Sequence, residues 1–241
     1  VVMPAYQAEA FVAQGIASAL AQSLTDLEMV VVDDCSTDGT WDVLQRCARE
    51  DPRVVALRQP RRSGASAARN VGIARARGRW VALLDADDLF LPQRLERMVE
   101  RAEAEGADLL GDNLLKSDFA AGAPLGRCFG DEALTFNGPL PLAELVRRDM
   151  PGQERLAKFG FLQPIMRRAF LLEHGLRYAE DVGVGEDFLL YFEAVARGGR
   201  FHLMPEAHYI YRLRPGSVSN HRGCALHLSK ANERMVRIAE G

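Results

Sequence analysis

Acidic side chains follow three of the apolar segments in the first half of the chain. They are Glu9 after the first segment, Asp33 and Asp34 after the second, and Asp85, Asp87 and Asp88 after a later one. If these segments are parallel strands, their carboxyl ends meet at one edge of a sheet, where open α/β sheets bind ligands. Acids gathered at one edge repel one another unless a cation or hydrogen-bond donors compensate. Three such groups therefore favour a binding site, whereas any single group could simply cap the next helix.

The triplet Asp85-Ala86-Asp87, followed by Asp88, has the chemistry of a divalent-cation site. Carboxylate oxygens suit Mg²⁺ or Mn²⁺ held jointly with the diphosphate of a substrate. The same residues could instead serve a phosphatase of the haloacid dehalogenase type, as nucleophile and acid. That class expects Thr or Val where Leu89 stands, and it places the motif on the first strand.

The segments around these acids alternate between strand and helix patterns, and four helices are expected at residues 8–22, 40–49, 66–77 and 93–105. Five strands are expected, at residues 1–3, 28–32, 54–57, 80–84 and 107–110. Such alternation predicts a mainly parallel sheet covered by helices on both faces, an α/β fold. Pro4-Ala5-Tyr6-Gln7 stands where a dinucleotide-binding fold would have its glycine-rich turn, which argues against that class.

The second half of the chain has a different pattern. Glycines and prolines break residues 114–159 into loops and short pieces. Beyond them we expect an extended piece at 161–166, a helix at 186–197, two paired runs at 201–204 and 207–213, and a terminal helix at 224–239. We therefore expect one continuous domain, with a ligand-binding half at residues 1–113 and a smaller α+β half at 114–241.

Composition excludes several classes of protein. With 48% apolar residues the chain can build a core, and its net charge of -3 gives no basic field for nucleic acid. No apolar run reaches the roughly 18–20 residues that span a bilayer. The four cysteines form no CxxC pair, which favours reduced thiols in the cytoplasm. The five histidines show no metal-ligand spacing.

Four stretches, in this order and spacing, resemble family 2 glycosyltransferases: residues 2–9 (VMPAYQAE), 30–40 (VVVDDCSTDGT), 64–72 (GASAARNVG) and 83–88 (LLDADD). The resemblance is specific over residues 1–110 and looser beyond. It implies a GT-A fold and an inverting transfer of a sugar from a nucleotide-sugar donor. It also implies dependence on Mn²⁺ or Mg²⁺.

The resemblance implies a donor-binding set. Pro4, Ala5, Tyr6 and Asp34 would hold the nucleobase, which makes uridine the expected nucleoside; Asp85, Ala86 and Asp87 would lie at the ribose and diphosphate, with Glu9 and Arg69 also in the set. Asp87 and Asp88 would hold the metal ion. For Arg69 a structural ion pair with a nearby acid is an equal alternative.

The second half adds a further match. Gly185-Glu186-Asp187 resembles the ED motif of the family, whose second acid is the catalytic base. We expect the start of a helix to keep Asp187 ionised and Glu186 to point elsewhere; the alternative is that both acids only complement the helix dipole. Residues 211–217 (YRLRPGS) resemble a loop of the family that approaches the diphosphate, although a solvated turn is the simpler interpretation for Arg214.

The sequence therefore predicts an enzyme that transfers a sugar, expected from a UDP-sugar, to an acceptor hydroxyl in cell-surface polysaccharide synthesis. The expected partners are a nucleotide sugar and a glycan or lipid-linked acceptor. We expect a cytoplasmic location, with peripheral association at the inner membrane face left open. The alternatives are the phosphatase above and a non-catalytic carbohydrate-binding module. The sugar, the acceptor, the linkage and the oligomeric state are not indicated.

Overall fold

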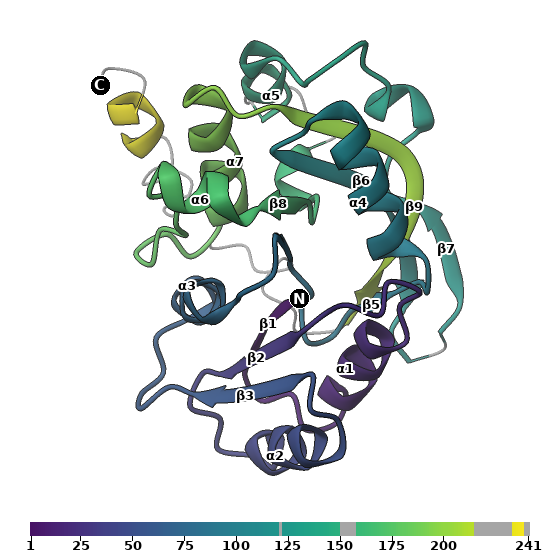
Figure 1. The fold of residues 1–241 in the computed structure, drawn as a ribbon, viewed down its shortest axis with the longest axis vertical. Coiled ribbons are helices and arrows are strands. Elements are labelled where there is room, and N and C mark those ends of the chain that lie inside the picture. The colour runs from purple at the N-terminus through teal and green to yellow at the C-terminus, as the bar shows by residue number, and fades with distance from the viewer. Residues whose placement is uncertain (121, 150–157, 215–232, 239–241) are drawn as a thin grey trace.

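The structure is a computed structural model that describes residues 1–120, 122–149, 158–214 and 233–238 of the 241-residue chain. The first half alternates strands and helices as expected (Figure 1). In chain order these are β1 (Val2–Ala5), α1 (Val12–Leu20), β2 (Met29–Asp33), α2 (Thr40–Glu50), β3 (Val54–Arg58), α3 (Ala65–Arg75), β4 (Trp80–Ala82), β5 (Leu89–Phe90) and α4 (Arg94–Glu105). The helix α4 ends at Gly106 in the left-handed conformation, at a φ of 62°.

The second half is more irregular, as the sequence indicated, yet it holds more regular structure than expected. Its elements are β6 (Leu109–Asp118), β7 (Pro124–Arg127), η1 (Asp131–Leu134), α5 (Leu142–Asp149), η2 (Phe159–Phe161), β8 (Ile165–Arg167), α6 (Arg168–Glu173), α7 (Glu186–Ala196) and β9 (Phe201–Leu213). A last helical piece covers residues 233–238; the rest of the expected terminal helix lies outside the described residues.

The strands form two connected sheets. The strands β1, β2 and β3 are parallel neighbours, with Ala5 opposite Asp33. The second sheet has the order β4-β8-β6-β9-β5, with β7 paired to β6. A parallel bridge between Val2 and Leu83, which follows β4, joins the two sheets. As a result β1 lies between β2 and the segment after β4, which brings the two acidic strand ends together.

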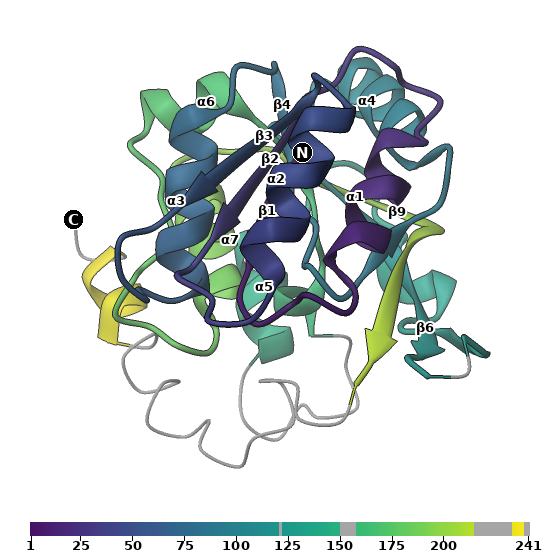
Figure 2. The same cartoon turned by 90° about the horizontal axis from the view of Figure 1, so that it is seen from below.

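Helices cover both faces of the sheets, as the alternating pattern predicted (Figures 1 and 2). Met3 and Val31 lie in a core cluster with residues of α1, α2 and α4. Val2 and Val30 lie in a second cluster, with residues of α3, α5, α6 and α7. All five residues of β2 are buried, which is typical of a central parallel strand.

Two expectations about the second half were wrong. The runs at 201–204 and 207–213 do not pair with each other but belong to one strand, β9, which is parallel to β6. The register shifts between Gly111 and Asn113, so Pro205, which cannot donate to a ladder, falls in a bulge. In addition, the strand expected at 107–110 was too short, because β6 continues to Asp118.

Candidate active site

The carboxyl ends of β1, β2 and β4 meet in one place. The Asp34 N–H donates to the carbonyl of Ala5 at 2.8 Å, and the Leu84 N–H donates to the carbonyl of Val2 at 3.1 Å. The acids after β2 and those after β4 therefore lie on either side of the turn that follows β1.

Asp34 is buried and anchors the segment that leads into α3. Its carboxylate accepts hydrogen bonds from the N–H of Ser63 at 2.7 Å, the N–H of Gly64 at 2.8 Å and the side-chain amide of Gln59 at 2.8 Å. Gly64 has a φ of 93°, a conformation that glycine adopts at no steric cost. Oδ2 accepts only the Gly64 bond among the described residues, which leaves that oxygen capacity for a further donor.

The turn after β1 presents an aromatic ring beside Asp34. Pro4 is half-buried and Ala5 buried, whereas Tyr6 is 38% exposed with the guanidinium of Arg62 4.2 Å from its ring centre. Gln7 has a φ of 50°, and its side-chain oxygen accepts hydrogen bonds from the N–H groups of Thr37 and Asp38. Sequence reasoning missed the roles of Gln7 and Arg62, although Gln7 stands inside a stretch that it had singled out.

Glu9 has a different place from the one expected. It is exposed, and its carboxylate accepts a hydrogen bond from the N–H of Gly39 at 2.9 Å, immediately before α2. Asp38 accepts a further bond from the N–H of Thr40 at 3.1 Å. Glu9 therefore serves the start of α2, and we withdraw it from the donor-binding set.

The acids after β4 fall into different environments. Asp85 and Asp87 are partly exposed, whereas the Ala86 side chain is buried in the core, so only its backbone could reach a donor. Asp88 is buried, and its two oxygens accept hydrogen bonds from the Tyr209 hydroxyl at 2.7 Å and the Arg212 N–H at 2.8 Å. The structure thus engages Asp88 with β9, and we withdraw it as a metal ligand.

Asp87 remains a suitable ligand for a cation. Burial raises its pKa, the charge of Asp85 raises it further, and Arg214, whose Nε lies 3.3 Å from Asp87 Oδ2, lowers it. Negative charge at this turn is therefore incompletely balanced by the protein, and the oxygen donors are of the kind that Mg²⁺ and Mn²⁺ take. Among the described residues no group of three or more His, Cys, Asp or Glu could hold a metal alone. A metal ion here would need ligand oxygens from a substrate.

Arg69 joins the two halves of the site. It projects from α3 and is buried, with Nη2 2.9 Å from Asp85, Nη1 3.0 Å from Glu186 and the same Nη1 3.6 Å from Asp187. Its guanidinium also lies 5.2 Å from the ring centre of Tyr178. The ion-pair alternative for Arg69 is therefore the arrangement observed, and it brings the acid of the β4 turn together with both acids of α7.

The surroundings of Asp187 perturb its ionisation. Burial raises its pKa to about 7; Arg69 opposes this increase, while Glu186 and Asp85 add to it. The start of the helix therefore does not hold the pKa of Asp187 at its ordinary value, because desolvation and two neighbouring acids raise it. The expectation that Glu186 points elsewhere was wrong, since both acids reach the same nitrogen of Arg69.

Asn70, next to Arg69, positions the segment before α7. Its amide donates to the carbonyl of Tyr178 at 2.9 Å and to Glu180 at 2.9 Å, and its oxygen accepts the Tyr178 N–H at 2.8 Å. Sequence reasoning assigned no role to Asn70 or Tyr178. The stretch 64–72 contained Asn70, but its partner more than a hundred residues away carried no readable signal.

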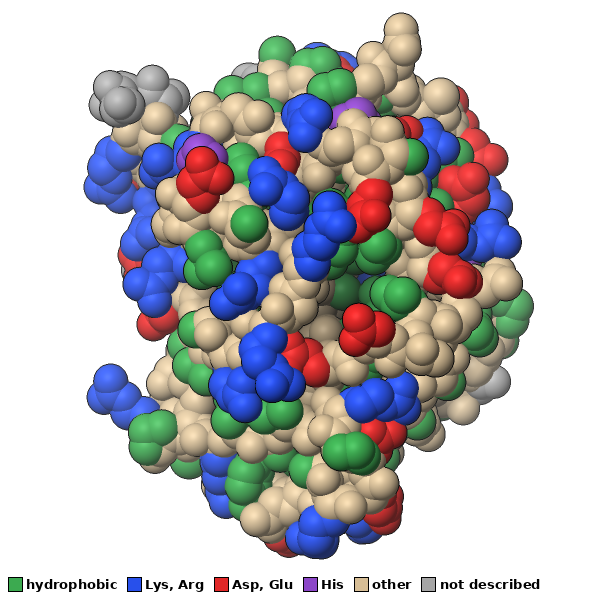
Figure 3. All heavy atoms as spheres, in the orientation of Figure 1, with side chains coloured by type: hydrophobic (Ala, Val, Ile, Leu, Met, Phe, Trp, Pro, Cys, Tyr) green, Lys and Arg blue, Asp and Glu red, His purple; other side chains and the backbone are tan. Residues whose placement is uncertain are grey.

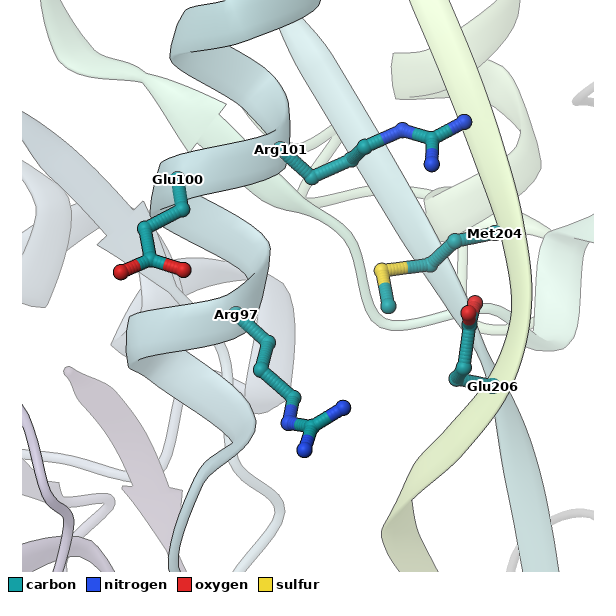
Figure 4. Close-up of a pocket in the computed structure, with 5 residues that line it drawn as sticks. All are labelled: Arg97, Glu100, Arg101, Met204 and Glu206. Carbon is teal, nitrogen blue, oxygen red and sulfur yellow. The ribbon is translucent and has the colours of Figure 1, made fainter.

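Other surface features lie apart from these acids. A shallow cavity of about 330 Å³ lies between α4 and β9, where Arg97 and Arg101 extend toward Met204 and Glu206 (Figure 4). None of its lining residues belongs to the site above. Basic and acidic side chains are interspersed on the face shown in Figure 3. No helix in the described part of the chain is long and apolar enough to cross a membrane.

Comparison with known proteins decides the family. The model of the family described as glycosyl transferase family 2 matches residues 1–121. The chain belongs to this family. A relative, the succinoglycan biosynthesis protein ExoO of Rhizobium meliloti, is 41% identical over 220 residues, which are 90% of this chain and 61% of ExoO. The chain thus spans about six-tenths of the length of that relative.

Solved structures show the same GT-A fold for this family 2 glycosyltransferase. The crystal structure of residues 1–349 of S. aureus TarS in complex with UDP-GlcNAc is similar with a TM-score of 0.80 and 20% identity, covering 98% of this chain and 65% of that chain. The mannosyltransferase PcManGT from Pyrobaculum calidifontis, in complex with GDP-Man and Mn²⁺, has a TM-score of 0.67 and 21% identity, covering 98% of this chain and 63% of that chain. With the family shown, the haloacid dehalogenase alternative is dropped.

Proposed function

We propose that this chain is the catalytic part of an inverting glycosyltransferase that moves a sugar from a UDP-sugar to an acceptor hydroxyl in polysaccharide synthesis. Family membership, the role of ExoO in succinoglycan biosynthesis and the UDP-GlcNAc bound to TarS support this proposal. The observation that carries it is the cluster around Arg69, in which Asp187 lies with Asp85 of the donor-side turn. A base beside a donor turn is the arrangement that sugar transfer requires.

Asp187 is the proposed catalytic base. A sugar hydroxyl is a weak nucleophile until its proton is removed, and a positioned carboxylate contributes roughly 10²–10⁴-fold to such a step. A base with a pKa of about 7 combines a substantial ionised fraction at neutral pH with a strong affinity for the proton. The acceptor oxygen then forms the bond to the anomeric carbon as the bond to the nucleoside diphosphate breaks.

The donor set consists of residues from β1, β2 and the β4 turn. The Tyr6 ring offers a stacking surface for a nucleobase, with Pro4 and Ala5 as its support, and Asp34 Oδ2 offers an acceptor for the N3–H of uracil. Asp85 and Asp87 lie nearest the diphosphate end in this proposal.

Asp87 is the proposed protein ligand of a Mn²⁺ or Mg²⁺ ion, and PcManGT, which was crystallised with Mn²⁺, supports metal use within this fold. Such an ion offsets the negative charge that develops on a departing diphosphate. In this proposal the donor set orients the donor, and Asp187 takes the proton of the acceptor hydroxyl. Asp87 would supply the carboxylate that holds the metal ion, and Arg214 balances the charge of Asp87 in the free protein.

The acceptor in this proposal is a glycan or a lipid-linked sugar, handled on the cytoplasmic side of the membrane. The role of ExoO in succinoglycan biosynthesis supports a polysaccharide-type acceptor.

A panel of nucleotide sugars tests the proposal. Thermal shift with Mn²⁺ should show stabilisation by UDP and by UDP-sugars, and one UDP-sugar should be hydrolysed slowly without an acceptor. Binding with no hydrolysis of any donor and no transfer to glycan acceptors would favour the non-catalytic carbohydrate-binding module instead.

A further inference from the structure

The cluster around Arg69 contains one cation and three carboxyl groups. The side chain of Arg69 is 5% exposed, that of Glu186 15%, that of Asp187 17% and that of Asp85 29%. Solvent therefore compensates little of the excess negative charge. A buried carboxylate without a partner is costly, so the position of the single cation governs which acid can ionise.

The two terminal nitrogens of the Arg69 guanidinium face carboxyl groups of the protein. Nη2 faces Asp85, and Nη1 faces both Glu186 and Asp187, while Nε is buried with no hydrogen-bond partner among the described residues. The Tyr178 ring lies 5.2 Å away. Both terminal nitrogens of this buried side chain thus face carboxyl groups of the protein, which favours a role within the cluster over contact with a ribose or a diphosphate.

We propose that Arg69 is a positioning residue that acts on the base and not on the donor: it holds Asp187 in place and favours its ionised form. The proposal rests on the proposed function, because it takes Asp187 as the base. It assigns to Arg69 the task of keeping a buried carboxylate available for a proton at neutral pH.

The groups that face Asp187 come from several elements. Asp85 from the β4 turn and Glu186 from α7 carry like charge, and the buried hydroxyl groups of Tyr178 and Tyr191 stay neutral because their pKa values lie well above the ordinary range. Arg69 is the facing group that favours the anion by its charge. Loss of that charge leaves three acids together, so the proton on Asp187 should be held more tightly.

The test compares Arg69→Met and Arg69→Lys with the parent. The Asp187 carboxyl is followed by ¹³C NMR as a function of pH in the free protein, its signal assigned with Asp187→Asn, and the same pH range is used for kcat/KM. Arg69→Met should raise the midpoint of the Asp187 titration and the midpoint of the pH profile of kcat/KM by at least one pH unit. At pH 6 this shift alone lowers kcat/KM about tenfold relative to the parent. Arg69→Lys should move the two midpoints less, and UDP affinity should stay within about threefold.

Arg167→Met is the matched control. Arg167 also forms an ion pair, with Asp108 at 2.6 Å, but at the start of β6 and with no residue of the cluster. Arg167→Met should leave the midpoints of the Asp187 titration and of the kcat/KM profile unchanged, even if the free energy of unfolding falls.

Three outcomes overturn the proposal. One is an Asp187 titration in Arg69→Met equal to that of the parent; another is a tenfold or greater loss of UDP affinity, which would make Arg69 a donor ligand. If Arg69→Met does not fold, Arg69→Gln, which also removes the charge, provides the same readouts, and an unchanged titration of Asp187 there contradicts the proposal. The proposed function has a separate test: it fails if Asp187→Asn turns over at the full rate. The two tests are independent, because the NMR titration of Asp187 does not depend on catalysis.

Discussion

Asp187 occupies a position that disfavours the ionised form of its carboxyl group. It lies mostly out of solvent beside Glu186 and Asp85, and only Arg69 supplies a nearby opposite charge among the groups that set its pKa. Catalytic groups commonly lie where burial and like charges move a pKa toward neutrality, whereas a residue selected for stability alone would avoid such a place. The conflict between stability and charge at this residue is therefore an argument for function.

The first prediction concerns stability. Asp187→Asn should raise the free energy of unfolding by at least about 1 kcal/mol at pH 8, since one pKa unit corresponds to about 1.4 kcal/mol. Because the folded pKa of about 7 exceeds the ordinary 3.8, the folded state holds the proton more tightly. The cost of ionisation is thus absent below pH about 4 and complete above pH about 7.

Urea unfolding of the parent and the variant at several pH values measures this difference. Asp181→Asn, which removes a surface ion pair with Arg234, is the control and should show no such gain. A lower stability of Asp187→Asn at pH 8 would contradict the account of its ionisation.

The second prediction concerns the nucleobase. Uracil has an N3–H that can donate to Asp34, whereas cytosine has none at N3, and a hydrogen bond to a charged group contributes about 1.5–3 kcal/mol. Calorimetry should therefore show UDP binding at least about tenfold tighter than CDP. In Asp34→Asn this ratio should fall toward one. Equal affinities in the parent, or a preference for GDP, would contradict the uridine assignment.

At the scale of elements, β9 positions the acidic turn after β4, residues 85–88, through hydrogen bonds. The hydroxyl of Tyr209 accepts the N–H of Asp85 at 3.2 Å and donates to Asp88 at 2.7 Å, and the Arg212 N–H also donates to Asp88. A late strand thus determines the shape of a turn that lies more than a hundred residues earlier. Asp87, which is partly exposed, lies between the two residues that β9 holds.

The third prediction tests that support. Tyr209→Phe leaves the buried Asp88 carboxyl without one donor, so it should lower the free energy of unfolding by about 1–3 kcal/mol and weaken Mn²⁺-dependent UDP binding. Tyr191→Phe is a matched control, because its hydroxyl donates to the Leu162 carbonyl at 2.8 Å, away from the turn. It should lower stability similarly while leaving UDP affinity intact. Equal losses of UDP affinity in both variants would contradict a specific role for Tyr209.

Sequence reasoning succeeded where the signal is local. The strand at Met29–Asp33 and the helix that starts at Glu186 were predicted because apolar runs and periodicity depend on neighbouring residues. It failed where partners are distant: nothing near Asp88 indicates that Tyr209 binds it, and nothing near Glu9 indicates Gly39. Tertiary contacts, and not the local sequence, therefore determine the roles of Asp88 and Glu9.

For the whole molecule, the active site depends on contact between the early and late parts of the chain. The proposed donor set lies on residues 1–90, while Asp187 comes from α7 in the second half of the chain (Figure 1). Arg69 and Asn70 of α3 make the contacts to both the α7 acids and the segment before them. Neither part could form this site by itself.

The fourth prediction follows from how few ligands the protein offers a metal. Calorimetry should show weak Mn²⁺ binding to the free protein and at least tenfold tighter binding in the presence of UDP, whose diphosphate supplies oxygens. Asp87→Asn should remove most of this nucleotide-dependent gain, whereas Asp118→Asn, on β6 outside the site, should keep it. Tight Mn²⁺ binding without nucleotide would contradict the arrangement.

The most direct test of the central claim is sugar transfer by Asp187→Asn. We predict a loss of transfer of roughly 10²–10⁴-fold with UDP and Mn²⁺ affinity retained, because a general base contributes about that much to the step and does not hold the donor. Glu186→Gln should lose less. If Asp187→Asn transfers sugar at close to the parent rate, another group removes the acceptor proton and the account of this site is wrong.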